Sequence, residues 1–333
     1  MMSIAVLGAG SWGTALAVHL ARAGRTVRLW ARDRELVEQM LRDRTNARYL
    51  PDVTLPEGVT ATASLAEAVS GVGFVLVSVP SHGLRAVVHA AVPHARPDAV
   101  FVSATKGLET GTLDRMSQVI TEETAGRSPV VVLSGPSFAV EVARELPTAV
   151  LVASAHPDAA ASVQEHFRGR GLRLYVSDDV PGVEIGGALK NVIAIAAGVV
   201  EGLGLGHNAM AALITRGLAE ISRLASAEGG RRDTLAGLSG LGDLVLTCTG
   251  DLSRNRHVGI ELGRGRSLQE ILAGMRMVAE GIRTTGAAVA LGHRHDIELP
   301  ITAQMAAVLE GTVSPLQAVD TLMGRRQRPE TDD

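Results

Sequence analysis

The sequence predicts an α/β protein in which an N-terminal doubly wound parallel sheet is followed by an all-α C-terminal domain. Three observations support this fold. Up to about residue 180, short apolar segments typical of buried strands alternate with longer helical segments, the order of a parallel sheet covered on both faces. After Asp178 only helical patterns follow. The first strand runs directly into G-A-G-S-W-G, the glycine pattern of a Rossmann-type dinucleotide site.

The individual elements follow from the spacing of apolar, glycine and proline residues. In a first domain, 1–180, the sequence predicts strands at 3–8, 26–31, 73–79, 99–103, 129–133, 149–154 and 172–176. Helices are expected at 11–23 and 34–41, and after the strands at 73–79, 99–103 and 129–133. In a second domain, 181–325, the expected helices are 183–200, 208–228, 255–262, 268–273, 282–291, 301–309 and 315–321. Residues 326–333 are expected to form a frayed tail.

The composition narrows the classes of function. A chain of 333 residues is long enough for two separate cores. Its formal net charge of -3 and aromatic content of 2% argue against a nucleic-acid partner, which would need basic and stacking surfaces. The single cysteine, Cys248, excludes an intrachain disulfide and a cysteine-based zinc site, and no histidine or carboxylate spacing indicates a metal.

The distribution of apolar residues predicts neither a signal peptide nor a membrane span. The N-terminus lacks a basic region, and its apolar run is interrupted by glycines. No stretch of 18 or more apolar residues lacks a charge or an amide; the nearest is broken by Lys190 and Asn191. We therefore expect a cytoplasmic protein without stable membrane insertion, and we expect it to form a homodimer.

The turn after the first strand predicts a phosphate-binding site. Gly8 permits a tight turn, Gly10 lets a pyrophosphate approach the backbone, and Gly13 allows the helix to pack closely. The backbone N–H groups and the dipole of the following helix would then meet the anion. The alternative is a glycine-rich turn without a ligand, and the strand before and the helix after it favour the dinucleotide.

The end of the second strand predicts which dinucleotide is bound. An acidic residue there accepts hydrogen bonds from the ribose 2′-hydroxyl, whereas an arginine accommodates a 2′-phosphate. The sequence has Arg32 at this position, followed by Asp33 and Arg34. Two guanidinium groups can clamp a phosphate, so we expect NADP(H) to be accepted and even preferred. Two alternatives stay open: the arginines could face solvent, and Asp33 keeps NAD(H) possible.

A charge inside an apolar helix points to the reacting group. The run I-G-G-A-L-K-N-V-I-A-I-A-A, 185–197, contains Lys190 in its middle. On a helix, Gly186 and Gly187 lie on the face of this lysine, which predicts a hollow with room for a ligand. A buried structural ion pair is the alternative explanation for Lys190.

A second polar segment, 238–259, offers a partner and an anion site. Asp243 lies among glycine and apolar residues, where an unpaired carboxylate would be costly, so Lys190 is its expected partner. The helix that follows opens with S-R-N-R at 253–256, which combines a capping residue, free N–H groups and guanidinium groups. This start predicts a phosphate site, although a basic helix start on the surface would look similar.

Nine motifs carry a resemblance to a known family. They are G-A-G-S-W-G (8–13), N-A-R-Y-L-P (46–51), V-P-S-H-G-L-R (79–85), A-T-K-G-L-E (104–109), S-G-P-S-F-A (134–139), L-K-N (189–191), I-T-R-G-L-A-E (214–220), G-L-G-D-L-V-L-T-C-T (240–249) and S-R-N-R (253–256). With these motifs the sequence resembles NAD(P)-dependent glycerol-3-phosphate dehydrogenases of the bacterial type over nearly the whole chain. The resemblance implies reversible reduction of dihydroxyacetone phosphate to sn-glycerol 3-phosphate for phospholipid synthesis, with NADP(H) and/or NAD(H).

The resemblance also implies roles for individual residues. Lys190 is the implied catalytic acid and base, with Lys106 and Asp243 as further catalytic residues. The implied substrate contacts are Lys106, Gly135, Ser137, Lys190, Asp243, Ser253, Arg254 and Asn255. The implied cofactor contacts are Ser11, Trp12, Arg32, Tyr49, Lys106, Ala139, Arg254, Val278 and Glu280, which join Gly8, Gly10, Gly13 and Arg34. The sequence departs from the family at Val140, often a lysine, and at His82 and Gly83, which bears on local loop geometry.

Two other functions compete with this one. A two-domain 2-hydroxyacid or ketopantoate-type reductase also uses a lysine on the first helix of its second domain. Its substrates are carboxylates, which would not need the S-R-N-R cluster. A dinucleotide-sensing protein without turnover is the third possibility, and the presence of Lys106, Lys190 and Asp243 argues against it.

Overall fold

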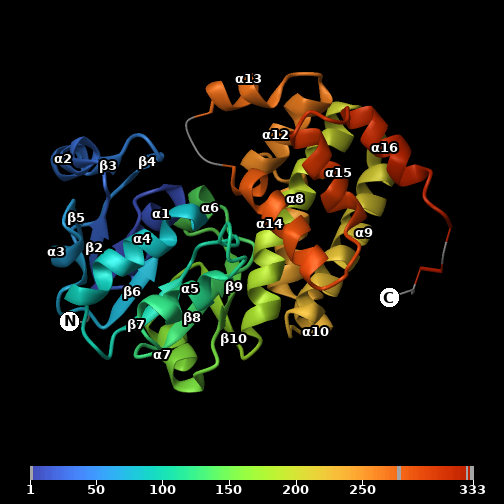
Figure 1. Cartoon of the computed structure of the whole chain (residues 1–333). Coiled ribbons are helices and arrows are strands. Elements are labelled where there is room, and N and C mark those ends of the chain that lie inside the picture. The colour runs from blue at the N-terminus through green and yellow to red at the C-terminus, as the bar shows by residue number, and fades with distance from the viewer. Residues whose placement is uncertain (1–2, 276–278, 328, 331–333) are drawn as a thin grey trace. The chain divides into compact units, whose positions relative to one another are not determined.

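The computed structural model describes residues 3–275, 279–327 and 329–330, and these fall into two compact units (Figure 1). The first unit runs up to Lys106 and continues through Asp114–Val180. The second unit comprises Gly107–Leu113 and the chain from Pro181 onward. The second unit therefore includes a short loop from the first half of the sequence, which the expected division at residue 180 leaves out.

The first unit is built on an eight-stranded sheet of order β10-β9-β8-β7-β6-β1-β2-β5. Its strands are β1 (Ser3–Leu7), β2 (Thr26–Trp30), β5 (Val59–Thr62), β6 (Phe74–Val77), β7 (Val100–Ser103), β8 (Val130–Ser134), β9 (Thr148–Ala153) and β10 (Leu172–Ser177). Every neighbouring pair is parallel except β8 with β9, which is antiparallel. The prediction of a mainly parallel sheet is confirmed.

Helices cover both faces of this sheet. Successive residues of a strand point to opposite faces, so both faces carry apolar side chains that need cover. In β1, Ile4 and Val6 join one apolar core, whereas Ala5 and Leu7 join another. The helices of this unit are α1 (Ser11–Arg22), α2 (Arg34–Asp43), α3 (Leu65–Val69), α4 (Ser81–Ala91), α5 (Met116–Glu123), α6 (Ala139–Ala143) and α7 (Pro157–Phe167), with a 3-10 turn η1 (Val92–His94). The doubly wound architecture is therefore the predicted one.

The sequence does not predict three strands of this unit. β3 (Thr45–Asn46) and β4 (Leu50–Thr54) form a separate antiparallel pair. β5 reads V-T-A-T and lacks a continuous apolar run because it is the edge strand beside β2 and has only one neighbour. The predicted strand 73–79 is shorter, Phe74–Val77, since Pro80 precedes the first residue of α4.

The second unit is helical. Its elements are α8 (Val180–Gly202), α9 (Gly206–Ala227), α10 (Arg232–Leu235), a π-helical turn η2 (Leu238–Gly242), α11 (Asp243–Thr249), α12 (Arg254–Gly263), α13 (Leu268–Ala273), α14 (Glu280–Arg294), α15 (Pro300–Leu309) and α16 (Pro315–Met323). Each predicted helix of this half is present, and the described part of the unit contains no strand. The turn η2 and its flanking helices α10 and α11 were not predicted.

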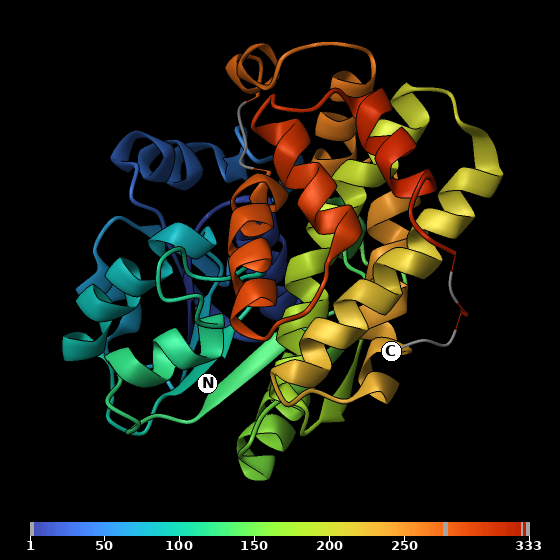
Figure 2. The ribbon, with the colours of Figure 1, turned by 45° about the vertical axis from the view of Figure 1, so that its right-hand side comes forward.

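Helix α8 lies among the other helices of this unit (Figure 2). By length and composition it could cross a membrane, but its most apolar window is 100% buried inside the protein. It crosses α12 in direct backbone contact: a Cβ on Gly198 would lie 2.0 Å from the carbonyl oxygen of Arg256, and one on Gly259 would lie 1.9 Å from that of Ile195. Glycine at this crossing therefore fixes the start of α12 relative to α8.

Candidate active site

The three glycines of the turn between β1 and α1 have different roles. Gly8 has a φ of +114°, and a Cβ there would lie 2.6 Å from the carbonyl oxygen of Ser78. A Cβ on Gly13 would lie 1.9 Å from the carbonyl oxygen of Gly8, so α1 packs directly on the turn. At Gly10 an added Cβ would meet no described atom within 4 Å. Helix α1 has no side-chain cap and no acidic residue in its first turn, so its amino end suits a pyrophosphate.

A buried asparagine holds this turn in place. The Asn46 side chain is fully buried and donates hydrogen bonds to the Ala9 carbonyl oxygen (2.9 Å) and to Thr14 Oγ1 (2.8 Å). Ser11 Oγ donates to the carbonyl oxygen of Tyr49 at 2.7 Å. The structure therefore brings Ser11 and Tyr49 together. Sequence reasoning missed Asn46, although a lone asparagine beside a glycine turn is a recognisable signal.

Trp12 and Ala139 lie against the same apolar core of the first unit. Among the described residues, the buried Nε1 of Trp12 has no hydrogen-bond acceptor. A buried N–H donor without an acceptor fits a position that contacts a ligand. Val140 packs on this core as well, so the departure from lysine places an apolar side chain in an apolar environment. His82, the other departure, is exposed near the start of α4.

The end of β2 carries the residues expected at the adenosine ribose. Asp33 caps α2, because its carboxylate accepts hydrogen bonds from the N–H groups of Glu35 (3.0 Å) and Leu36 (3.2 Å). The N–H of Leu36 and the guanidinium of Arg48 hold the pKa of Asp33 below its usual range. Arg32 and Arg34 are both exposed. The predicted phosphate clamp by these two arginines stays a prediction.

Three predicted substrate residues of the first unit lie together. Lys106 Nζ donates to the carbonyl oxygen of Gly135 at 3.0 Å, and Ser137 Oγ donates to the same oxygen at 2.9 Å. Gly135 has a φ of +139°, and a Cβ there would lie 3.0 Å from Cα of Val150. Lys106 follows β7 and Gly135 follows β8, so the group lies at the carboxyl ends of adjacent parallel strands, the edge where such sheets bind ligands.

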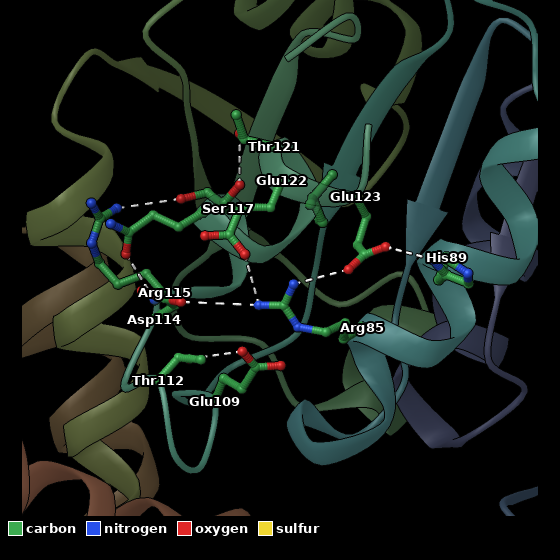
Figure 3. A network of polar contacts seen from close by, with 12 residues as sticks. Arg85, His89, Glu109, Thr112, Asp114, Arg115, Ser117, Thr121, Glu122 and Glu123 are labelled. Carbon is green, nitrogen blue, oxygen red and sulfur yellow. Dashed lines mark hydrogen bonds and ion pairs between the residues drawn. The ribbon is translucent and has the colours of Figure 1, made fainter. Parts of the chain in front are cut away.

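An ionic network fixes α4 to α5 (Figure 3). Arg85 of α4 forms ion pairs with Glu122 (2.8 Å) and Glu123 (2.9 Å) of α5, and lies 4.0 Å from Asp114. His89 Nδ1 lies 2.8 Å from Glu123. Arg85 belongs to the V-P-S-H-G-L-R motif, and its contacts give that motif a structural role.

The second unit contains the predicted buried ion pair. Lys190 on α8 is 7% exposed, and its Nζ is paired with the fully buried carboxylate of Asp243. Nζ also donates to Thr247 Oγ1 at 2.9 Å, and this hydroxyl donates to the carbonyl oxygen of Asp243 at 2.6 Å. The expected partnership of Lys190 and Asp243 is confirmed. Sequence reasoning missed Thr247, although its place four residues after Asp243 puts both on one face of α11.

The turn η2 sets the position of Asp243, which directly follows it. A Cβ on Gly240 would lie 2.0 Å from the carbonyl oxygen of Leu235, and one on Gly186 would lie 2.7 Å from that of Ser239. The predicted hollow is therefore wrong at Gly186, because backbone of η2 fills that space, whereas at Gly187 it stays a prediction. Gly186 lets α8 approach η2, and π-helical turns often occur at functional sites. The glycine thus brings Lys190 and Asp243 together instead of making room for substrate.

Other possible nucleophiles and ligands are limited in the described part of the chain. Cys248 is buried next to this pair, and its burial raises the pKa of the thiol to about 12, although the charges of Lys190 and Arg256 oppose the shift. A thiol that stays protonated is a poor nucleophile. Among the described residues, no group of three or more histidine, cysteine or acidic side chains could hold a metal ion.

The start of α12 combines buried and exposed polar groups. Ser253 caps the helix by accepting a hydrogen bond from the N–H of Arg256 at 3.2 Å. Asn255 donates to Asn191 Oδ1 at 2.9 Å and accepts from the N–H of Gly281 at 3.0 Å. The amide of Asn255 thus links α12 to α8, beside Lys190, and to α14.

Three further predicted residues of this unit are Arg254, Glu280 and Val278. Arg254 is exposed, so an incoming anion can reach it. Glu280 is the first residue of α14, directly before the glycine that Asn255 holds. Val278 lies outside the described residues. The ligand contacts of Ser253, Arg254, Asn255 and Glu280 stay predictions.

Comparison with known proteins gives matches along nearly the whole chain. The family model described as NAD-dependent glycerol-3-phosphate dehydrogenase N-terminus matches residues 3–160, and the corresponding C-terminus model matches residues 179–320. A relative from Koribacter versatilis, named as an NAD(P)+ glycerol-3-phosphate dehydrogenase, is 55% identical over 329 residues and covers 98% of each chain. A relative of the same name from Thioalkalivibrio sulfidiphilus is 53% identical over 327 residues, with the same coverage.

Solved structures give a consistent result. The crystal structure of glycerol-3-phosphate dehydrogenase from Coxiella burnetii is similar with a TM-score of 0.94 and 44% identity, covering 97% of this chain and 99% of that chain. A ketopantoate reductase from Ralstonia eutropha is similar with a TM-score of 0.62 and 18% identity, covering 96% and 100%. At that identity the second likeness shows a shared fold and nothing more.

Proposed function

The chain belongs to the family of NAD-dependent glycerol-3-phosphate dehydrogenases, and from this membership we propose how its own residues carry out the reaction. It is an NAD(P)-dependent oxidoreductase that reduces dihydroxyacetone phosphate to glycerol 3-phosphate. The observation that carries the proposed mechanism is the buried pair of Lys190 and Asp243, because it sets one ammonium group in a defined position inside an apolar helix bundle.

Lys190 is the proton donor for reduction. When bound, the nicotinamide supplies a hydride to C2 of the ketone. The ammonium of Lys190 gives a proton to the oxygen on C2, and in the reverse reaction the amine accepts that proton. Asp243 and Thr247 orient the ammonium through the contacts described above. A positioned acid of this kind contributes most when its geometry is fixed before the substrate arrives.

The first unit holds the cofactor. The pyrophosphate would lie at the amino end of α1 beside Gly10, where the backbone is open, and Gly8 and Gly13 give the turn its shape. Ser11, Trp12, Tyr49 and Ala139 are assigned to the same ligand. We assign Arg32 and Arg34 to the 2′-phosphate, so that NADPH is the preferred reductant.

Substrate residues are assigned in each unit separately. We assign the phosphate group to Arg254 and to the amino end of α12, with Ser253 and Asn255 supporting that end of the helix. Lys106, Gly135 and Ser137 of the first unit are assigned to the substrate as well. Arg254, Glu280, Lys106 and Val278 are assigned to the cofactor as well.

We propose that the protein acts in the cytoplasm as a homodimer and supplies the glycerol phosphate of phospholipids. Sedimentation equilibrium of the purified chain tests the assembly. A mass equal to that of a single chain at micromolar concentration would contradict the homodimer.

One assay tests the central proposal. The purified chain should oxidise NADPH when dihydroxyacetone phosphate is added, and Arg254→Ala should raise the KM for this ketone far more than it changes kcat. Ketopantoate, a carboxylate ketone, serves as the comparison substrate. Turnover of ketopantoate in preference to dihydroxyacetone phosphate would favour the other reductase class, and tight NADPH binding without any turnover would favour a sensor.

A further inference from the structure

We infer that Arg48 determines the specificity for the 2′-phosphate of NADP(H), because it pairs with Asp33 and cancels the charge that would repel this phosphate. The inference rests on the function proposed above, in which the first unit binds the dinucleotide. Arg48 stands outside the glycine turn and outside the R-D-R segment that the sequence offers for the ribose.

The carboxylate of Asp33 is occupied on both oxygens. Its Oδ1 accepts from the N–H groups of Glu35 and Leu36 at the start of α2. Its Oδ2 accepts from Nη1 of Arg48 at 2.7 Å. A carboxylate in this part of a Rossmann-type unit usually accepts from the ribose 2′-hydroxyl. Here Oδ1 caps α2 and Oδ2 accepts from the guanidinium of Arg48, so the negative charge of Asp33 is already shared with a cation.

Asp33 still carries a negative charge that a 2′-phosphate would meet. The capping N–H of Leu36 and the contact with Arg48 hold its pKa below the usual range, so the group is ionised at neutral pH. Arg32 and Arg34 flank Asp33 in the sequence, and Arg48 contacts its carboxylate. With Arg48 present, Asp33 is neutralised and the two other arginines keep a net positive charge for the phosphate.

Arg48 lies in a segment that is hydrogen-bonded to the glycine turn between β1 and α1. Its neighbour Asn46 donates to the carbonyl oxygen of Ala9 in the glycine turn, and its neighbour Tyr49 accepts from Ser11. The guanidinium carbon of Arg48 lies 6.0 Å from the centroid of the Tyr49 ring. The segment 46–49 is therefore attached to the glycine turn through Asn46 and Tyr49, and to Asp33 through the side chain of Arg48. The exposed fractions of the two side chains, 51% for Arg48 and 39% for Asp33, leave both accessible to a ligand.

This ion pair is too exposed to matter greatly for folding. Pairs of this kind contribute little to stability, since water and salt screen them. The effect of removing Arg48 should therefore be seen in ligand binding instead of in the unfolding transition. The pair of Arg42 and Asp43 at the other end of α2 is a matched control, because it is also exposed and is 2.9 Å long.

Isothermal titration with two adenosine fragments tests the inference without turnover. The ligands are adenosine 2′,5′-bisphosphate, which carries the 2′-phosphate, and 5′-AMP, which lacks it. Arg48→Ala should weaken binding of the bisphosphate about tenfold, the factor that corresponds to one lost charge-assisted interaction, and should change 5′-AMP binding less than about twofold. Arg48→Lys should recover most of the loss. Asp33→Asn combined with Arg48→Ala should also recover part of it, because the repelling charge is gone while an oxygen remains for the cap.

The outcomes separate this inference from the proposed function. If Arg48→Ala leaves the ratio of the two dissociation constants unchanged, or if Arg42→Ala changes it equally, the inference is wrong while the dehydrogenase function stands. A wild-type protein that binds 5′-AMP as tightly as the bisphosphate also overturns it. A wild-type protein that does not oxidise NADPH with dihydroxyacetone phosphate would instead overturn the proposed function. The fragment titration would still decide the role of Arg48.

Discussion

The buried pair of the second unit and the Arg85 network of the first unit differ in how exposed their charged groups are to water. Lys190 is 7% exposed and Asp243 is fully buried, so this pair has little contact with water. The Arg85 side chain is 33% exposed and faces three carboxylates, of which Glu122 is 55% exposed. The network thus has more charges than the pair, but water reaches them.

The difference shows that burial, more than the number of charges, decides how much free energy is lost when an ion pair is broken. A charge left alone in a low-dielectric interior costs several kcal/mol, whereas an exposed charge that loses a partner is taken up by water. A buried pair is therefore a sensitive arrangement that a reaction can use. An exposed network instead holds helices in register and tolerates change.

Removal of Lys190 should give the largest effect and tests whether the buried pair is catalytic. We expect Lys190→Ala to lower kcat for dihydroxyacetone phosphate by about 10²- to 10⁴-fold, the range that a positioned general acid contributes. The dissociation constant of NADPH, measured by fluorescence titration, should stay unchanged. A kcat within a factor of about three of wild type, well below that range, would show that the pair is structural.

Removal of Asp243 tests the energetic side of the comparison. Asp243→Ala leaves the Lys190 ammonium buried without its carboxylate, so the free energy of unfolding should fall by about 3–5 kcal/mol. Glu122→Ala is the matched control, because Arg85 keeps Glu123 and the loss should stay below about 1 kcal/mol. Urea unfolding followed by circular dichroism measures both variants, and equal losses would contradict the role given to burial.

The same comparison explains what the sequence could predict. A charge inside an apolar run needs a partner, so Lys190 and Asp243 could be paired from sequence alone. The glycine turn is equally local, since strand, glycines and helix are contiguous. The network around Arg85 was not predicted, because charged residues on exposed helix faces have many possible partners and none is required.

Tertiary packing accounts for what sequence reasoning missed. Gly186 was interpreted as leaving a hollow, but the turn η2 lies about 50 residues further along the chain and fills that space. Asn46 and Thr247 were missed for the same reason, since their hydrogen bonds depend on segments that only the fold brings together. Local patterns predict which residues are unusual, whereas contacts between distant segments decide how they are used.

A buried histidine extends the comparison to pH. His19 is 4% exposed, and its Nε2 lies 2.8 Å from the Phe167 carbonyl oxygen. Burial lowers the pKa of His19, which means that the unfolded chain binds a proton more readily than the folded one. The stabilisation is therefore complete above the unfolded pKa of about 6.5 and is lost as the pH falls toward the lower, folded pKa.

A substitution at His19 isolates this effect. His19→Gln keeps an N–H donor for Phe167 but cannot titrate, so the loss of stability between pH 7 and 5 should be smaller by up to about 1.4 kcal/mol per pH unit. Urea midpoints at several pH values measure the wild type and the variant. A His19→Gln chain that loses as much stability as the wild type between pH 7 and 5 would contradict the role given to His19.

The smallest expected effect is that of Arg85, and salt makes it informative. Arg85→Ala should lower the free energy of unfolding by about 1 kcal/mol at low salt, because Glu122 is largely exposed and Glu123 keeps its contact with His89. At 1 M salt the Debye length is about 3 Å, so most of this difference should vanish. The loss in Asp243→Ala should persist at the same salt, since ions do not enter the core where Lys190 lies. If salt instead abolished the Asp243→Ala loss and left that of Arg85→Ala intact, the buried pair would behave as a surface pair and the contrast between the two regions would fail.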